Sequence, residues 1–156
     1  MDEWGLLGRV LLAGLVGYLV GWERHVRGRP AGERTFALLA MGAAGFTVAG
    51  TFLAPSEPGK VLAGVATGIG FIGAGLVFRT GGMEVHGLTT ATAAWATAAL
   101  AVIIGLGAYV VGVGSAVAIL FLLEIPYAPG LRYLDPRRYA HRFRTDTDPP
   151  GQGGPS

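Results

Sequence analysis

A dense charged stretch lies between two long apolar runs near the start of this chain, and it constrains the fold more than any other feature. Residues 23–35 hold four arginines and two glutamates, whereas residues 6–22 and 36–54 are almost wholly apolar. A charged side chain at the centre of a bilayer costs about 2.5–3.5 kcal/mol. The charged stretch must therefore lie in water or among lipid headgroups, and the apolar runs beside it are predicted to cross a membrane.

The composition supports this interpretation. Only 14% of the residues are charged, against about 25% in a typical soluble domain, and the charges are clustered rather than spread along the chain. The mean hydropathy is +0.50. The chain has no cysteine, which excludes disulfide bonds and thiolate metal sites. These values favour one helical domain embedded in lipid.

The lengths of the apolar runs predict the individual spans. A bilayer core of about 30 Å needs about 20 helical residues, which residues 6–22, 36–54 and 61–78 supply. The run 88–124 would reach about 55 Å as one helix, so we divide it at Gly105-Leu106-Gly107 into spans at 88–104 and 108–123. The prediction is an all-α, five-helix transmembrane bundle over residues 1–125. No segment shows the alternation of a membrane-barrel strand, so β structure is not expected.

Two further segments follow the predicted bundle. Residues 126–144 are basic, and residues 145–156 are rich in proline and glycine with little apolar content, so this tail is predicted to be disordered. The basic segment is predicted to contact anionic lipid headgroups, and nucleic-acid binding is not expected. Its arginines alternate with tyrosines, and the four that we single out are Arg132, Arg137, Arg138 and Arg142.

The positions of the basic residues predict the orientation. With five spans and the amino terminus outside, ten of the twelve lysines and arginines fall on the cytoplasmic side, and only Arg9 and Lys60 lie elsewhere. Cytoplasmic loops carry an excess of such residues. We therefore expect an outside amino terminus and a cytoplasmic carboxy terminus. Arg9, about one turn inside the first span, is expected either to extend to the outer interface or to pair with a carboxylate that the sequence does not identify.

Glycines at helical spacing mark the first and third predicted spans. Gly17 and Gly21, like Gly64 and Gly68, are four residues apart, and small residues at this spacing let membrane helices approach closely. We therefore predict tight helix packing and self-association into a homo-oligomer. An alternative is that the run 68–75 breaks its helix and presents carbonyls to an ion or solute. The glycines of this run are Gly68, Gly70, Gly73 and Gly75.

Charged residues are predicted to gather at the cytoplasmic ends of the first three helices. Glu23 is expected to pair with Arg34 or Arg79, because buried charges need partners. Thr89 or Thr90 is expected to cap the fourth helix. This cluster is either a structural clamp with a lipid-binding rim or a docking surface for another protein. Its predicted members are Glu23, Arg24, Arg29, Glu33, Arg34, Thr35, Arg79, Thr89 and Thr90.

The sequence gives little support for metal chemistry or catalysis. Magnesium prefers carboxylate oxygens and water, and no Asp or Glu lies deep in a predicted span, so an ion path would depend on backbone carbonyls or threonine hydroxyls. Glu23 with Glu84 is a candidate weak magnesium site, and no other cofactor is expected. The histidines have no metal-binding spacing, and no nucleotide-binding loop or catalytic triad is present. We therefore predict that the chain is not an enzyme.

Four motifs in order resemble the MgtC/SapB family, specifically its amino-terminal transmembrane domain. The first are Gly21-Trp22-Glu23-Arg24 and the segment 29–35, which reads RPAGERT. The others are the segments 68–75, GIGFIGAG, and 87–95, GLTTATAAW. The resemblance covers residues from about 9 to about 107. Glu33 departs from the family pattern, which has an apolar residue there, and is expected to form a local pair with Arg34.

The resemblance implies a five-span protein of the bacterial cytoplasmic (inner) membrane. It links the chain to growth at low magnesium, acid stress or survival inside host cells. Within the family one view holds that these proteins transport magnesium, and another that they regulate membrane proteins such as the ATP synthase. Many relatives carry a soluble domain after the fifth span, which is not expected here. The leading hypothesis is a non-enzymatic regulator, and the alternative is a transporter or channel for magnesium or another ion.

Overall fold

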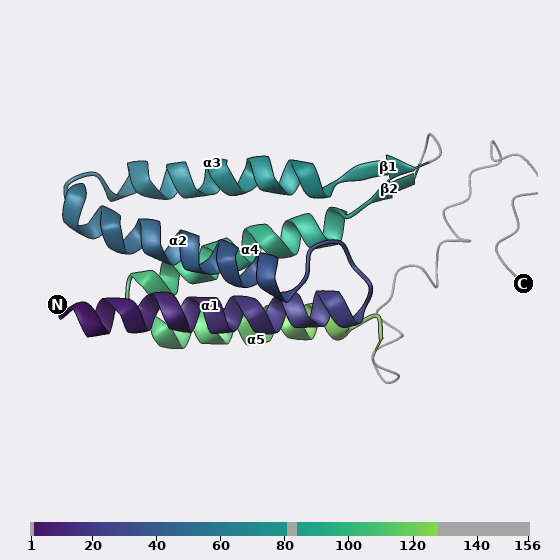
Figure 1. Cartoon of the computed structure of the whole chain (residues 1–156), viewed down its shortest axis with the longest axis horizontal. Coiled ribbons are helices and arrows are strands. Elements are labelled where there is room, and N and C mark those ends of the chain that lie inside the picture. Colours follow the sequence, from purple (N-terminus) through teal and green to yellow (C-terminus); the bar gives the residue numbers. More distant parts are fainter. Residues whose placement is uncertain (1, 81–83, 128–156) are drawn as a thin grey trace, which may run out of the picture. The chain divides into compact units, whose positions relative to one another are not determined.

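Five helices form most of the described part of the chain, in the order in which the sequence predicts them (Figure 1). The computed structural model describes residues 2–80 and 84–127, apart from the side chains of residues 78–85. The helices are α1 (Glu3–Val26), α2 (Glu33–Leu53), α3 (Pro58–Leu76), α4 (Leu88–Gly105) and α5 (Tyr109–Glu124). The first four are long and apolar enough to cross a membrane, whereas α5 is apolar but shorter. The helical membrane fold is therefore confirmed.

A short antiparallel hairpin between α3 and α4 was not predicted. Strand β1 (Phe78–Thr80) pairs with β2 (Glu84–His86), so that Arg79 lies opposite Val85. The sequence argument excluded only the long alternating strands of a membrane barrel, and strands of three residues are too short to show such a pattern. The expectation of no β structure was wrong at this one position among the described residues.

Helices α1 and α2 pack closely because glycines remove side chains from their interface. A Cβ atom placed on Gly17 would lie 2.5 Å from the carbonyl oxygen of Phe36. One placed on Gly21 would lie 2.6 Å from the Cα atom of Glu33. Neither position has room for a side chain, so the two backbones touch directly. Phe36 is itself fully buried and anchors the core between them.

Helix α4 completes this core, whereas α3 lies mostly outside it. More than half of the residues of α4 are buried, and it contacts α1, α2 and α3. In contrast, Ile69 is the one buried residue of α3. Helix α3 touches α2 near its start, where Val61 lies against Gly50, and approaches α4 near its end, where Gly73 faces Ala91. The glycine-rich run 68–75 stays helical as far as Leu76, so the structure contains no helix break there.

The connections bring two sets of helix ends together, as Figure 1 shows. The end of α1, the start of α2, the end of α3, the hairpin and the start of α4 share one end, which we call the basic end. The start of α1, the end of α2, the start of α3 and the α4–α5 turn share the opposite end. The chain divides into two units, Met1–Leu120 and Phe121–Ser156. The predicted basic segment and tail lie outside the described residues from position 128 onward.

Candidate functional site

A buried pair of opposite charges lies at the basic end of α1. The side chains of Glu23 and Arg24 are 7% and 3% exposed, and the Nε atom of Arg24 donates a hydrogen bond to Oε2 of Glu23. Arg24 continues the buried face of α1, which includes Ala13, Gly17 and Val20. An arginine at the end of an apolar helical face is therefore held inside the fold and not at its surface.

The second oxygen of Glu23 faces another arginine of the same helix. Its Oε1 atom lies 3.8 Å from Nε of Arg27 and accepts no hydrogen bond from the described part of the chain. The predicted pairing of Glu23 with Arg34 was wrong, since Arg34 is exposed and Glu23 contacts Arg24 and Arg27 instead. The spacing of four residues between Glu23 and Arg27 is a signal that could have indicated this contact. The side chain of Arg79 lies outside the described residues.

The connection between α1 and α2 is held by a side-chain hydrogen bond that the sequence did not indicate. Nδ1 of His25 lies 2.5 Å from Oε2 of Glu33, joining the last turn of α1 to the first residue of α2. His25 and not Arg34 is therefore the hydrogen-bond partner of Glu33, while the positive charge of the neighbouring Arg34 also acts on the Glu33 carboxylate. In the loop, the backbone N–H of Arg29 donates to the carbonyl oxygen of Arg24 at 2.9 Å.

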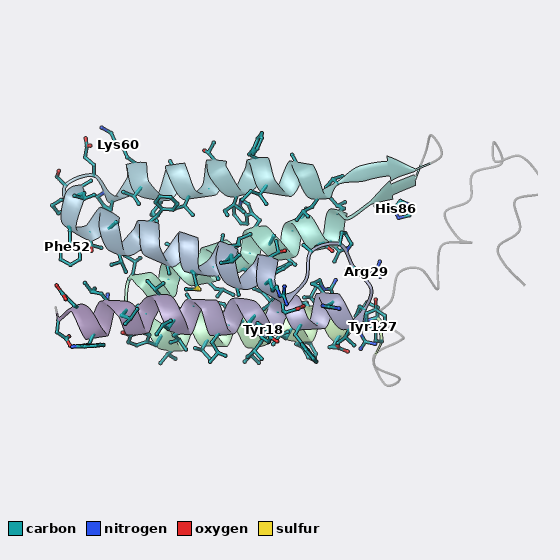
Figure 2. All side chains as sticks on the ribbon, in the orientation of Figure 1. Tyr18, Arg29, Phe52, Lys60, His86 and Tyr127 are labelled. Atoms are coloured by element: carbon teal, nitrogen blue, oxygen red, sulfur yellow. The ribbon has the colours of Figure 1, made fainter. Side chains whose placement is uncertain are left out.

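The exposed members of the predicted cluster gather around this loop. Arg29 lies at the basic end in Figure 2, and Arg34 and Thr35 are exposed on the first turn of α2. Ala31 in the loop adopts a left-handed conformation with φ of 63°. The loop thus presents arginine side chains to the surroundings while its backbone is fixed against the end of α1.

The start of α4 is capped by a glycine and not by a threonine. Gly87 occupies the cap position with φ of 84°, and no side chain bonds to the first free N–H groups of the helix. A Cβ atom at this position would overlap the carbonyl oxygen of Leu76, so only glycine fits. The predicted cap by Thr89 or Thr90 was wrong. Thr90 is instead 1% exposed in the core, and Thr89 is exposed.

Arg9 at the opposite end has partners that the sequence analysis missed. Its Nη1 atom donates to the carbonyl oxygen of Gly105 at 3.0 Å, and its Nε atom donates to the hydroxyl of Tyr109 at 3.2 Å. A cation at the carboxyl end of a helix is favoured by the helix dipole. These two acceptors lie about one hundred positions further along the chain, and the sequence analysis named neither of them.

The described residues do not form a metal site of the usual kind. No three histidine, aspartate or glutamate side chains converge within the described part of the chain. Glu23, one member of the predicted magnesium pair, already contacts two arginines. The side chain of Glu84, the other member, lies outside the described residues, so this pair stays a prediction.

A large hollow between α2 and α3 is lined entirely by apolar residues. Its volume is about 640 Å³, and leucine, isoleucine, valine, phenylalanine, alanine and glycine supply the whole lining. Gly42 and Phe46 line it from α2, and Gly64, Gly68 and Ile72 line it from α3. A surface of this kind suits lipid or another apolar helix, because nothing in it replaces the water around an ion.

These features define a multi-pass helical membrane protein with a buried Glu–Arg pair at one end. The chain belongs to the MgtC family, whose family model matches residues 10–127. Protein SrpB of Synechococcus elongatus is 44% identical over 125 residues, which are 71% of this chain and 69% of that protein. Protein MgtC of Salmonella typhimurium is 46% identical over 100 residues, which are 64% of this chain and 43% of that protein. The resemblance found in the sequence is thereby confirmed.

A third relative carries a name that mentions transport. "Putative magnesium transporter YhiD" of Escherichia coli K12 is 36% identical over 126 residues, which are 75% of this chain and 58% of that protein. The chain therefore spans about half the length of the MgtC and YhiD proteins that it matches. No solved structure matches the chain.

Proposed function

We propose that this chain is a non-enzymatic regulator of other membrane proteins in the bacterial cytoplasmic membrane, acting under magnesium limitation, acid stress or survival in a host. Its basic end is the surface that contacts the regulated protein. The single observation that carries this proposal is where the charged side chains lie among the described residues. Exposed charges gather at the helix ends, while the hollow between α2 and α3 is lined by apolar residues.

The threonine hydroxyls within the helices do not support an ion path through the protein. The hydroxyls of Thr67 and Thr97 each donate to a carbonyl four residues earlier, at 2.8 Å. A threonine bonded to its own helix offers fewer free lone pairs to a passing ion. Selective ion paths are lined by converging carbonyls or rings of charge, and the hollow between α2 and α3 has neither.

The proposed orientation places the basic end in the cytoplasm. Arg24, Arg27, Arg29 and Arg34 lie there, as the excess of positive residues on the cytoplasmic side of membranes requires. The amino terminus is then outside, and the exposed arginines face both anionic headgroups and cytoplasmic segments of other proteins. Such segments would be acidic, since they have to complement this charge.

A photoreactive residue placed at Thr35 tests the proposal. Thr35 is exposed at the basic end, and the matched control position is Lys60, which is exposed at the opposite end. In native membranes we expect one dominant protein other than this chain to be captured from position 35 and not from position 60. Capture of no protein besides a second copy would contradict the proposal.

The second candidate function is transport of magnesium or another ion, and the name of the YhiD relative favours it. Purified protein in liposomes decides between the two. The regulator is expected to give no more magnesium flux than vesicles without protein. Flux that the exposed-site variant Arg34→Ala abolishes would overturn the regulator and establish the transporter.

A further inference from the structure

Helix α3 presents a face that nothing else in the described chain covers. Gly64, Gly68, Phe71 and Gly75 follow one another at spacings of four, three and four residues, so they share one side of the helix. All four are exposed, and a Cβ atom placed on any of the three glycines would meet nothing within 4 Å. This side of α3 is therefore open for a helix to approach.

A projection and a hollow lie next to each other on this face. Phe71 is 84% exposed and stands beside Gly68, which lines the apolar hollow between α2 and α3. That hollow, about 640 Å³, is several times the size of the cavity of about 150 Å³ that holds a benzene ring in another protein. In a two-fold pair, any contact between the projection of one copy and the hollow of the other is made in both directions.

Opposite charges lie at the start of the same face. Lys60 is one turn before Gly64, and its ammonium group lies 2.7 Å from Oε1 of Glu57 in the same chain. Both side chains are exposed, by 75% and 51%, and Figure 2 shows Lys60 extending from the start of α3. Two copies in one membrane share an orientation, so their α3 helices run parallel. In that arrangement the Lys60 ammonium and the Glu57 carboxylate of one copy lie at the same depth in the membrane as those of the other.

We propose that this face binds a second copy of the chain. The two α3 helices pack through Gly64 and Gly68, and Phe71 of each copy fills the α2–α3 hollow of the other. Exchange of the Glu57–Lys60 pairs fixes the parallel register. Self-complementary shape and charge on a single helix distinguish a second copy from a lipid chain, which has no charge to match. The proposal is independent of which protein the basic end contacts.

Cysteine crosslinking in native membranes tests the geometry, because the chain has no cysteine of its own. The Gly64→Cys variant places a thiol near the two-fold axis and is expected to form a disulfide-linked dimer on oxidation. The matched control is Val117→Cys on α5, which is also exposed and is expected to remain monomeric. Equal dimer yields from both positions, or capture of a different protein from position 64, would overturn the proposal.

A substitution at Phe71 tests the energetics. Loss of an aromatic anchor from the centre of an interface weakens association about 30-fold or more. We therefore expect Phe71→Ala to weaken self-association in lipid vesicles by this factor, measured by energy transfer between labelled copies. Phe52→Ala removes an exposed phenylalanine of α2 that does not line the hollow, and should leave association unchanged. Equal association of both variants would show that lipid fills the hollow and would overturn the proposal.

Mixing two charge variants distinguishes the proposed Glu57–Lys60 contact between copies from the Glu57–Lys60 pair within each copy. A Lys60→Glu copy and a Glu57→Lys copy each repel themselves, but each offers the charges that the other lacks. We expect mixed pairs to outnumber the identical pairs about fivefold in energy transfer, which is the size expected of exposed ion pairs. Random pairing in the mixture would overturn the proposed register.

Discussion

Helices α1 and α3 both carry glycines at helical spacing, and the structure uses the two sets differently. The backbone of α2 occupies the space beside Gly17 and Gly21 of α1. It comes within 2.5–2.6 Å of the positions that their Cβ atoms would take. Gly64 and Gly68 of α3 face open space within the chain. The same spacing thus holds a fold together in one helix and leaves a surface free in the other. A glycine motif in a membrane helix therefore indicates close approach without indicating which helix approaches.

The largest effect is expected from filling the α1–α2 contact. Gly21→Leu would place its Cβ atom 2.6 Å from the Cα atom of Glu33 and 2.7 Å from the carbonyl oxygen of Gly32, and backbone atoms cannot move aside cheaply. We expect the folded protein to be lost, measured as the monodisperse fraction after extraction in mild detergent. Gly8→Leu is the matched control, because nothing lies within 4 Å of its Cβ position on the same helix. Equal yields of the two variants would show that the close contact of α1 with α2 is not needed for folding.

The next effect concerns the buried pair at the basic end. Arg24→Met keeps the apolar stem but leaves the carboxylate of Glu23 buried beside a weaker contact with Arg27. Removing one partner of a buried ion pair costs about 3–5 kcal/mol. Denaturant unfolding in detergent should show this loss, and the double variant Glu23→Gln/Arg24→Met should recover most of it. A double variant as unstable as the single one would show that the charge pair is not the cause.

A smaller effect is expected at the opposite end of α1. Arg9→Met removes the hydrogen bonds to Gly105 and Tyr109, and hydrogen bonds from a charged donor contribute about 1.5–3 kcal/mol. Tyr109→Phe removes one of these bonds and should cost less than Arg9→Met in the same unfolding measurement. If Tyr109→Phe costs as much, the contact of Arg9 with Gly105 contributes nothing and α1 is not held to the α4–α5 turn in this way.

The smallest effect is a gain of stability in α3. Gly70 has nothing within 4 Å of its Cβ position and does not line the hollow. Gly70→Ala should therefore stabilise the protein by up to about 1 kcal/mol, because alanine favours a helix more than glycine does. The unfolding free energy in detergent measures this. Destabilisation instead would mean that α3 packs against something at this position and would remove the contrast with α1.

The helices of the fold could be predicted because their apolar runs are visible in the sequence without knowledge of any contact. The spans were predicted at 6–22, 36–54 and 61–78 because hydrocarbon excludes charge over a fixed thickness, and three helices cover nearly the same residues. The partners of individual charges did not follow. Glu33 meets His25 because the loop after α1 folds back at that point. Arg9 meets Tyr109 because helices pack side by side, and no local spacing encodes a contact across one hundred residues.

The amino-acid sequence by itself determined that this is a helical membrane protein of the MgtC family, where its apolar helices lie and which of its connections carry charge. These properties depend on the cost of placing each residue in lipid or water, which each stretch of sequence reports locally. The tertiary structure alone decided that Arg24 is buried with Glu23, that Gly87 and not a threonine caps α4, and that α3 keeps an open face beside an apolar hollow. Those properties depend on the distance between backbones, which only packing sets.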